Sequence, residues 1–541
     1  MLETLEREEQ RDGTSDVDES SQPSAPRCRS KRDLMVALSF ANLAYLQIWS
    51  VTLTYRRSDA CLMKTAPAPG EYAAIVAGIL FVAALLWLGV TAARRYLAPA
   101  GFRWVRVAFL LAMVLPANAV RVVIINRFSF PTLALSNLPA WRGAWLSAVL
   151  PGAALLAAVM LKPRLASHVA ASAVICFLPL APITFAQAAW KAANYDDTEL
   201  GVRLAPAIPN ARRLPRVLWV ICDDWDYYLS FPGRDPTLQL PNIDRLRADA
   251  LFASAAHPPG KVTKISVPGY LTGRLVKSVE FEGPGAMQVS FRDSESPESL
   301  AGSANAFKEV RALGANTAAV GWYLPYRRLF HNELVSCDWW PISSQYNSWG
   351  REFWPALPNQ LESLFESPSF SLAGQPLAVK GHVRTYLAML ARAEEVASDW
   401  NLQFTYLHLP VPHPPFAYNR RTARFDSRDF VHGYAGGLAL LDSALGELRR
   451  SMERGGTWND TTVVVTTDHP YRRQAELTRT SDPRIPYFLK LAGQREGRAY
   501  DAPFNAVLTK NLLIAVMRGE VADVQSAVRW LDANRLQVPL D

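Results

Sequence analysis

Five apolar runs within the first 190 residues constrain the fold more than any other feature of the chain. They cover residues 34–55, 71–93, 105–125, 141–161 and 168–189. Most of them reach the roughly 20 residues that a helix needs to cross the hydrocarbon core of a bilayer. The third run is the weakest, because Pro116 and Arg121 interrupt it, and a buried or re-entrant segment is the alternative there. We therefore expect an all-α membrane domain of about five spans over residues 34–190.

The basic residues between the apolar runs predict how this domain is oriented. Arginines and lysines are dense before the first run and in the second and fourth loops, and sparse in the first and third loops. Because basic loops stay in the cytoplasm, the N-terminus is predicted to be cytoplasmic. Five spans would then place the remainder of the chain outside, whereas four would leave it inside. Residues 1–33, rich in charged residues, serine and proline, are expected to be a disordered cytoplasmic tail.

The overall composition excludes several classes of protein. Half of the 541 residues are hydrophobic and only 20% are charged, with a formal net charge of +8. Much of the basic excess lies near membrane ends and proline-rich loops, so it indicates topology rather than nucleic-acid binding. The five cysteines are scattered without a CxxC spacing, which predicts neither a zinc knuckle nor a disulfide framework.

Residues 215–541 show the alternation of a soluble α/β domain, after a linker over about 191–214 that contains proline and arginine. Strand-like apolar runs occupy 217–222, 317–323, 404–410 and 461–467, and helical patterns occupy 241–250, 303–313 and 431–454. Apolar β-branched runs separated by amphipathic helices are typical of a mostly parallel sheet with helices on both faces. We therefore expect an α/β fold of this kind for the C-terminal part.

Carboxylates and an imidazole follow two of the predicted strands. Asp223 and Asp224 end the first strand, and Asp468 and His469 end the last. Ligands collect at the carboxyl ends of strands in such sheets, and three carboxylates with one imidazole suit zinc or manganese. Thr263 lies between them, in KVTKISVPGYLTGR. Its hydroxyl needs a metal or a base to act as a nucleophile, and we predict Thr263 as the fifth metal ligand. Each acidic pair, taken singly, is also compatible with an ordinary turn after a strand.

Over about residues 215–515 the sequence resembles the sulfatase-like branch of the alkaline phosphatase superfamily. The matching segments are PRVLWVICDD, LPNIDRLRADALFASAA, the LTGR ending, LGANTAAVGWY, the stretch from GYAGGLALLDSALGELRR to TTVVVTTDH, and RIPYFLKLAG. The resemblance implies an alkaline-phosphatase-like fold. It also implies a divalent metal, zinc first, with manganese or calcium as alternatives.

The nucleophile position separates two branches of that family. Sulfatases convert a cysteine or serine in a C/S-x-P-x-R motif to formylglycine, whereas this chain has Thr263 at the first position and Val267 at the last. A threonine cannot yield that aldehyde. The segment TKISVP instead resembles the Thr-x-x-Ser-x-Pro segment of membrane-bound phosphoethanolamine transferases that modify lipid A, which carry five spans before a periplasmic catalytic domain.

That second resemblance implies a reaction, a location and partners. Thr263 would take a phosphoethanolamine group from a phospholipid donor and pass it to an envelope lipid or glycan. The protein would be a multi-pass protein of a bacterial inner membrane with a periplasmic catalytic domain.

Three further residues receive roles from the resemblance or from their position. The segment YLHLPVPHPPFAY resembles the H-x4-H-x-P segment of the transferases, which implies that His413 is a substrate ligand or leaving-group acid. His408 is interpreted as a residue that satisfies the core. Lys264, next to Thr263, is predicted to stabilise the transferred group by its charge.

The chain also departs from both branches. Asp223–Asp224 is the sulfatase form where the transferases have Glu-Thr, Pro470 replaces a glycine, and Trp322 stands where sulfatases have a lysine. Histidine does not recur after His469, so a later ligand of the family is missing. Two alternatives to a transferase therefore stay open: a sulfatase-like hydrolase of phosphate or sulfate esters, and a non-catalytic envelope-assembly partner on the same fold.

Overall fold

The computed structural model forms two compact units, and each is described by itself. The first comprises residues 1–46 and 77–186, and the second comprises residues 47–76 and 187–541. Residues 47–76, predicted to belong to the membrane domain, therefore cluster with the second unit. The structure describes residues 26–53, 68–113, 115–117, 119–120, 162–195, 202–209, 211, 214–283, 285–341, 351–364, 376–425 and 433–540.

The N-terminal part is helical wherever it is described. Its helices are α1 (Pro26–Ala44), α2 (Leu46–Thr52), α3 (Pro69–Tyr96), α4 (Pro99–Ala112), α7 (Pro163–Ile175) and α8 (Leu180–Ala193). On α3, leucines and a phenylalanine are about half exposed, as expected of a surface that faces lipid rather than water: Leu80, Phe81, Leu85 and Leu88.

Three helical stretches among the described residues are long and apolar enough to cross a membrane: Pro69–Tyr96, Pro99–Ala117 and Pro163–Ala193. They overlap the second, third and fifth predicted runs. The first run falls on α1 and α2, which are not among the three, and the fourth, 141–161, lies outside the described residues. The count of five spans therefore stays a prediction. Helix α1 begins at Pro26, inside the segment that was expected to be a disordered tail.

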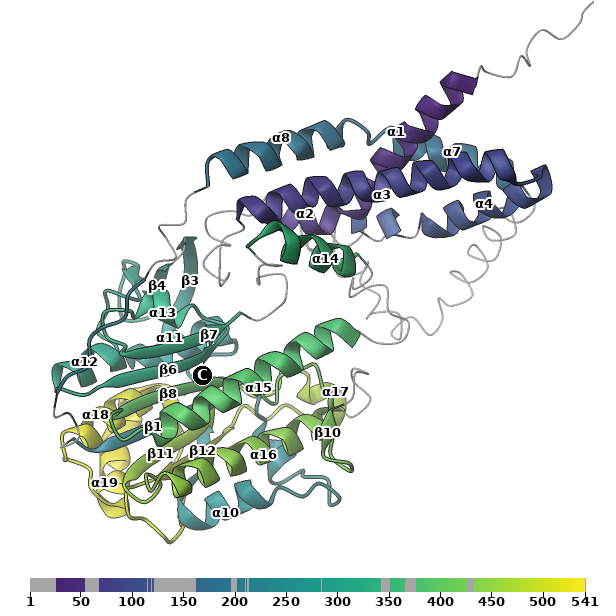
Figure 1. Cartoon of the computed structure of the whole chain (residues 1–541). Helices are drawn as coiled ribbons and strands as arrows, with labels where there is room; N and C mark the ends of the chain where they lie inside the picture. The colour runs from purple at the N-terminus through teal and green to yellow at the C-terminus, as the bar shows by residue number, and fades with distance from the viewer. Residues whose placement is uncertain are drawn as a thin grey trace, which may run out of the picture. The chain divides into compact units, whose positions relative to one another are not determined.

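The second unit is built on a nine-stranded sheet (Figure 1). Its order is β13-β2-β12-β11-β1-β8-β6-β7, with β14 beside β2. Strand β12 runs antiparallel to both neighbours, and the other pairs in this sheet are parallel, which confirms a mostly parallel sheet. The strands are β1 (Arg216–Cys222), β2 (Leu251–His257), β6 (Thr317–Trp322), β7 (Ser336–Trp340), β8 (Phe404–Leu409), β11 (Thr461–Thr467), β12 (Ile485–Lys490), β13 (Arg498–Tyr500) and β14 (Phe504–Asn505).

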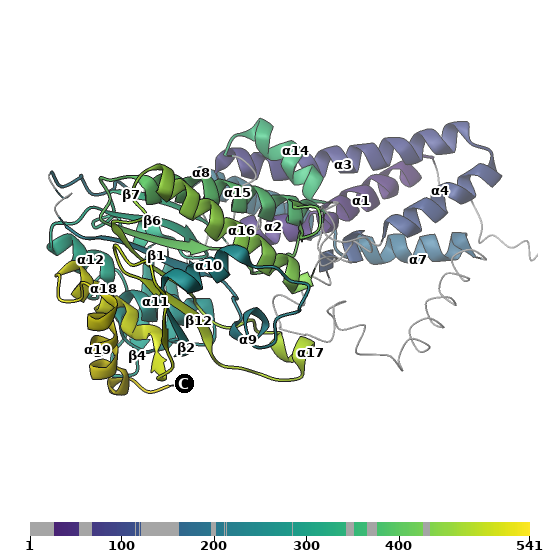
Figure 2. The same ribbon diagram turned by 90° about the horizontal axis from the view of Figure 1, so that it is seen from below.

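Helices cover both faces of this sheet, and each face has its own apolar core (Figures 1 and 2). Alternate residues of β1 show the division: Trp219 packs on one side, and Leu218 and Val220 on the other. One core includes α11 (Thr263–Thr272), α12 (Ala306–Ala312), α18 (Thr509–Met517) and α19 (Val524–Asn534). The opposite core includes α10 (Pro241–Asp249), α15 (Pro376–Ser398) and α16 (Gly433–Arg454).

Smaller elements complete the unit. A three-stranded antiparallel sheet follows α11 in the chain. It consists of β3 (Val276–Gly283), β4 (Ala286–Phe291) and β5 (Glu298–Ser299). The short elements are α9 (Tyr227–Ser230), α13 (Tyr326–Leu329), α14 (Phe353–Ser363), α17 (Gln474–Thr478), β9 (Tyr418–Asn419), β10 (Arg424–Phe425), and two 3-10 turns at Ala506–Leu508 and Arg535–Gln537.

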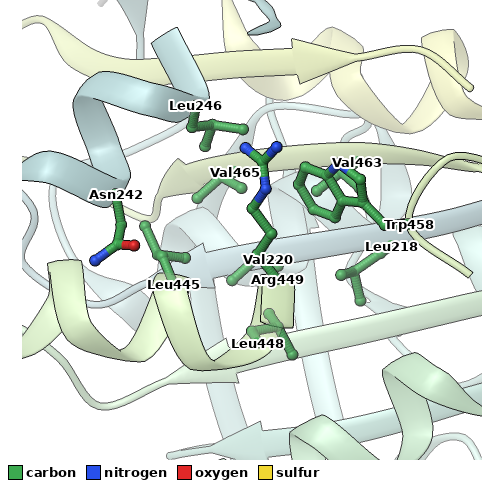
Figure 3. A pocket seen from close by; sticks show the side chains of 10 residues that line it. All are labelled: Leu218, Val220, Asn242, Leu246, Leu445, Leu448, Arg449, Trp458, Val463 and Val465. Atoms are coloured by element: carbon green, nitrogen blue, oxygen red, sulfur yellow. The ribbon is translucent and has the colours of Figure 1, made fainter. Parts of the chain in front are cut away.

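A small cavity lies between the sheet and the helices α10 and α16 (Figure 3). Its volume is about 20 Å³, enough for one water molecule. Its walls are mostly the mid-strand apolar side chains of β1 and β11 and the leucines of the two helices, with Asn242, Arg449 and Trp458 at its edge. The cavity is therefore a packing defect of the core, separate from the strand ends described below.

Candidate active site

Polar side chains converge where the central parallel strands end. Strands β1, β8 and β11 end in register, because Cys222 pairs with both Leu409 and Thr467. The next residues along the chain therefore meet at one edge of the sheet. Seven side chains gather there: Asp223 and Asp224 after β1, Asp468 and His469 after β11, His408 near the end of β8, His413 in the loop that follows it, and Trp322 at the end of β6.

His469 lies among the three carboxylates. Its Nε2 is 3.2 Å from Asp468 Oδ2 and 3.8 Å from Asp223 Oδ1, and its Nδ1 is 3.2 Å from Asp224 Oδ1. All four residues are almost completely buried. Asp224 has a φ of 66°, a left-handed conformation that a non-glycine residue holds only where its surroundings enforce it. Its backbone N–H donates to Asp468 Oδ1 at 3.3 Å, which links the two strand ends.

Thr263 reaches the same cluster from helix α11. It is the first residue of that helix, is buried, and places its Oγ1 3.4 Å from His469 Nε2. The first amides of a helix lack intrahelical partners, so this end of α11 suits an anionic ester oxygen. The structure thus brings together all five residues that the sequence predicted as metal ligands; their binding of a metal stays a prediction.

Lys264 behaves differently from its neighbour. Its side chain is exposed, whereas that of Thr263 is buried. Helical geometry turns successive residues by about 100°, which separates the two side chains. The predicted catalytic role of Lys264 therefore stays a prediction without a described contact to support it.

The two histidines of the β8 segment occupy different places. His413 Nε2 lies 3.9 Å from Asp224 Oδ2, and its Nδ1 donates to the carbonyl oxygen of Pro414 at 2.6 Å. His408 is fully buried, and its Nδ1 lies 2.9 Å from the hydroxyl of Tyr326. Its Nε2 has no hydrogen-bond partner among the described residues.

Ligand-type atoms of these histidines lie close to the carboxylates. Asp223, Asp224 and His413 form one group whose ligand atoms lie within 4.8 Å of one another, and Asp223, His408 and Asp468 form another. His408 was interpreted as a core residue, and it is one, but it also belongs to a group that is able to hold a metal. Its position five residues before His413 was the available signal in the sequence.

The carboxylates perturb one another because they are buried together. Burial, followed by the charges of Asp468 and Asp224, raises the pKa of Asp223 well above its ordinary value. Burial also raises the pKa of Asp224, but its hydrogen bond and charge interaction with His469 outweigh this and lower it overall. Such a cluster is stable only with a positive charge among its members.

The histidines respond to the same surroundings in opposite directions. Burial lowers the pKa of His469, but the nearby carboxylates, Asp468 first, outweigh this and raise it to about 10. Burial lowers the pKa of His408 to about 4 and also lowers that of His413. The latter two imidazoles are therefore neutral near pH 7 and present the form that binds metals.

The residues fit the divalent metal that the sequence predicts. Asp223 Oδ1, Asp468 Oδ2 and His408 Nε2 are buried and lack a hydrogen-bond partner among the described residues, although both carboxylate oxygens lie within ion-pair distance of His469 Nε2. Native proteins rarely leave such atoms unsatisfied, so a ligand for them is expected. A bound cation would complete these contacts, and carboxylate oxygens with imidazole nitrogens suit zinc or manganese.

Two aromatic residues at the site had no assigned role. Trp322, fully buried, donates its indole N–H to Asp223 Oδ2 at 2.7 Å. The ring of His382, on α15, meets Trp322 edge to face with centroids 5.7 Å apart, and the ring of His413 lies 6.0 Å away. The sequence held no signal for His382, because it lies within a helix far from the strand ends.

Comparison with known proteins identifies the family of the C-terminal part. The family model described as "Sulfatase" matches residues 215–507. An ulvan-active sulfatase from Formosa agariphila is 24% identical over 337 residues, which cover 54% of this chain and 59% of that protein. The chain thus spans less than two thirds of this curated relative.

Solved structures are also similar, at low sequence identity. PsFucS1 sulfatase from Pseudoalteromonas sp. is 13% identical with a TM-score of 0.40, covering 59% of this chain and 72% of that one. The phosphonate monoester hydrolase of Agrobacterium radiobacter is 15% identical with a TM-score of 0.40, covering 56% and 77%. Because the family model covers more than half of the sequence, the chain belongs to the sulfatase family.

Proposed function

We propose that this protein is a membrane-anchored, metal-dependent transferase. It takes a phosphoryl-linked headgroup, phosphoethanolamine from a phospholipid, onto Thr263 and passes the group to an envelope lipid or glycan. The cofactor is a divalent metal, zinc first, and the active site faces the periplasm of a bacterial inner membrane. The observation that carries the proposal is the position of Thr263 Oγ1, 3.4 Å from His469 Nε2 and beside three buried carboxylates.

A hydroxyl at this position favours phosphoryl chemistry over ordinary sulfatase chemistry. A threonine does not yield the aldehyde hydrate on which formylglycine sulfatases depend. It is able to form a phosphate ester, provided that its hydroxyl is activated. The metal, when bound, polarises the transferred group and lowers the pKa of the coordinated hydroxyl.

The proposed reaction has two steps, transfer of the group to Thr263 and transfer from Thr263 to the acceptor. In the first, Thr263 Oγ1 forms a bond to phosphorus while the bond from phosphorus to the glycerol oxygen of the donor breaks. The threonine proton is transferred to that oxygen, so the lipid leaves as an alcohol. In the second step an acceptor oxygen forms the new bond to phosphorus, the bond to Thr263 breaks, and the acceptor proton returns to the threonine.

In this proposal His413 carries the proton between these oxygens. Its Nδ1 proton is committed to the carbonyl of Pro414, and burial keeps the ring neutral, so Nε2 is a free acceptor. As a leaving-group acid it must therefore first take the proton that Thr263 loses. The first amides of α11 would stabilise the charge of the ester oxygens.

A sulfatase-like hydrolase is the second candidate, and the family membership itself favours it. The same covalent step on Thr263 would then end with water as the acceptor, and phosphate or sulfate would be released. The two candidates differ only in what attacks the threonine ester, so the acceptor decides between them.

The deciding experiment follows the adduct on Thr263. The full-length protein is incubated with phosphatidylethanolamine, and fragmentation by mass spectrometry localises any added mass. A transferase gives a phosphoethanolamine adduct on Thr263, and a hydrolase releases phosphate or sulfate from an ester without an acceptor. The proposal fails if the adduct lies on the neighbouring Ser266, or if Thr263→Ala works as well as the unmodified protein.

A further inference from the structure

Trp322 donates a hydrogen bond to one of the two carboxylate oxygens of Asp223. Its indole N–H donates to Oδ2 at 2.7 Å, and Oδ1 has no hydrogen-bond partner among the described residues. The indole nitrogen is a donor only, so it is unable to bind the metal itself. The indole therefore fixes the direction of the carboxylate and occupies one acceptor site of Oδ2, which leaves Oδ1 as the more available oxygen for a cation.

Asp468 also has one carboxylate oxygen that accepts hydrogen bonds from described residues and one that does not, but its donors are different. Its Oδ1 accepts hydrogen bonds from the backbone N–H of His469 at 2.9 Å and of Asp224 at 3.3 Å, and from the hydroxyl of Thr467 at 3.3 Å. Its Oδ2 has no hydrogen-bond partner among the described residues and lies 3.2 Å from His469 Nε2. Two carboxylates on neighbouring strands thus each have one oxygen fixed by donors and one oxygen beside His469.

Carboxylates that bind through one oxygen only restrict the metals that the site is able to hold. Calcium takes six to eight oxygen ligands and often uses both oxygens of a carboxylate, whereas zinc takes four or five ligands and accepts imidazole readily. We propose that Trp322 is a positioning residue that keeps Asp223 monodentate and thereby makes the site prefer zinc-class metals over calcium. The inference rests on the proposed function in one respect, the presence of a bound metal.

The packing of Trp322 explains why its indole is a dependable donor. It is the last residue of β6, is 1% exposed, and has the rings of His382 and His413 against it. Tyr323 follows with a φ of 72°, so the chain turns away directly after the tryptophan. The ring is therefore held between the strand, α15 and the loop that follows β8, and its N–H has little freedom to leave Asp223.

Trp322→Phe tests the inference, because phenylalanine fills most of the space but lacks the donor. The full-length protein is purified in detergent, stripped with a chelator and titrated with zinc and with calcium. Removing a hydrogen bond behind a metal ligand typically costs 10- to 100-fold in affinity. We expect a loss of that order for zinc and none for calcium, so the ratio of the two affinities falls. The cobalt-substituted protein should lose visible absorption intensity as Asp223 becomes bidentate.

Two further variants control the experiment. Trp400→Phe removes an indole hydrogen bond of similar length, 2.9 Å to the carbonyl of Gly455, away from the site and should behave as the unmodified protein. Trp322→Tyr keeps a ring with a donor at its edge and should recover part of the zinc preference. Trp322→Leu, which also lacks the donor, replaces Trp322→Phe as the test if the latter does not fold.

Three outcomes would overturn the inference. They are an unchanged ratio of zinc to calcium affinity in Trp322→Phe, an equal loss of both affinities, and a preference of the unmodified protein for calcium. If the unmodified protein binds no divalent metal, the proposed function fails together with this inference. Zinc binding that is insensitive to Trp322 removes this inference alone and leaves the proposed function standing.

Discussion

Thr263 differs from the other hydroxyls of its helix in what its side chain contacts. Its Oγ1 faces His469, whereas Ser266, one turn later and also buried, has no hydrogen-bond partner for its Oγ among the described residues. Thr263→Ala should lower turnover by about 10³-fold or more, because the covalent step has no other acceptor. Thr263→Ser should keep measurable activity, and Ser266→Ala should be near the unmodified rate. Turnover of a phospholipid donor by purified variants is the measurement. Full activity of Thr263→Ala would show that Thr263 is not the nucleophile, and no turnover by the unmodified protein would favour the non-catalytic alternative.

Lys490 lies outside the site, and its burial is expected to make the stability of the protein depend on pH. It is buried on β12, donates to the carbonyls of Trp458, Thr461 and Leu491, and burial lowers its pKa from 10.5 to about 8. The unfolded chain therefore binds this proton more tightly than the folded chain. The protonated lysine costs stability below pH 8, and the cost disappears as the pH rises toward 10.5.

The prediction concerns the difference in melting temperature between the unmodified protein and Lys490→Met. The melting temperature of the unmodified protein minus that of Lys490→Met should rise between about pH 8 and pH 10, because only the first loses a buried charge. Thermal unfolding of both proteins in the same detergent measures it. A difference that stays constant or falls over this range would show that the lysine is not destabilised by burial.

Part of the site was predictable from the sequence, for a simple reason. Asp223 and Asp468 directly follow apolar strand patterns, and the ends of parallel strands meet at one edge of a sheet. The place of His408 beside them was not predictable, because it depends on Tyr326, which lies 82 residues earlier and bonds its other ring nitrogen. Trp322 and His382 were missed because their roles come from packing between β6 and α15.

At the scale of elements, the sequence predicted the central strands almost to the residue. Runs at 217–222, 404–410 and 461–467 correspond to β1, β8 and β11, which are buried along their whole length and therefore read as continuous apolar runs. The strand order and the antiparallel direction of β12 were not predictable in this way. They arise from pairing between segments far apart in the chain, which local patterns do not encode.

Gly321 shows how tightly strand β6 is packed. A Cβ on this residue of β6 would come within 2.0 Å of the ring of Tyr326, which holds His408. Gly321→Ala should therefore destabilise the protein by about 1–3 kcal/mol and weaken metal binding. Gly381→Ala, on α15, meets nothing within 4 Å and should be neutral or up to about 1 kcal/mol stabilising. Denaturant unfolding compares the two, and equal effects would mean that Tyr326 moves aside freely.

For the whole molecule, we expect the buried carboxylates to make stability depend on a bound metal. A metal at 1,000 times its dissociation constant stabilises the folded state by about 4 kcal/mol. Chelation should lower the melting temperature, and zinc should restore it. Asp468→Asn should abolish this response. Asp442→Asn is the matched control, because Asp442 is a buried carboxylate on α16 that accepts from Ile243 and Asn242 instead, so it should lower stability but keep the zinc response. A zinc response in Asp468→Asn would contradict the assigned ligand set.

The number of spans decides on which side of the membrane the catalytic unit works. The catalytic unit lies outside, on the same side as the proposed donor and acceptor, only if the number of spans between the N-terminus and residue 215 is odd. The basic loops predict an odd number. An alkaline phosphatase reporter fused after Leu540 should then be active, and a green fluorescent protein at the same place should be dark. Deleting residues 141–161 should reverse both signals by removing one crossing, whereas replacing them with a leucine run of equal length should not. An inactive phosphatase fusion on the full chain would show an even number of spans and place the site in the cytoplasm.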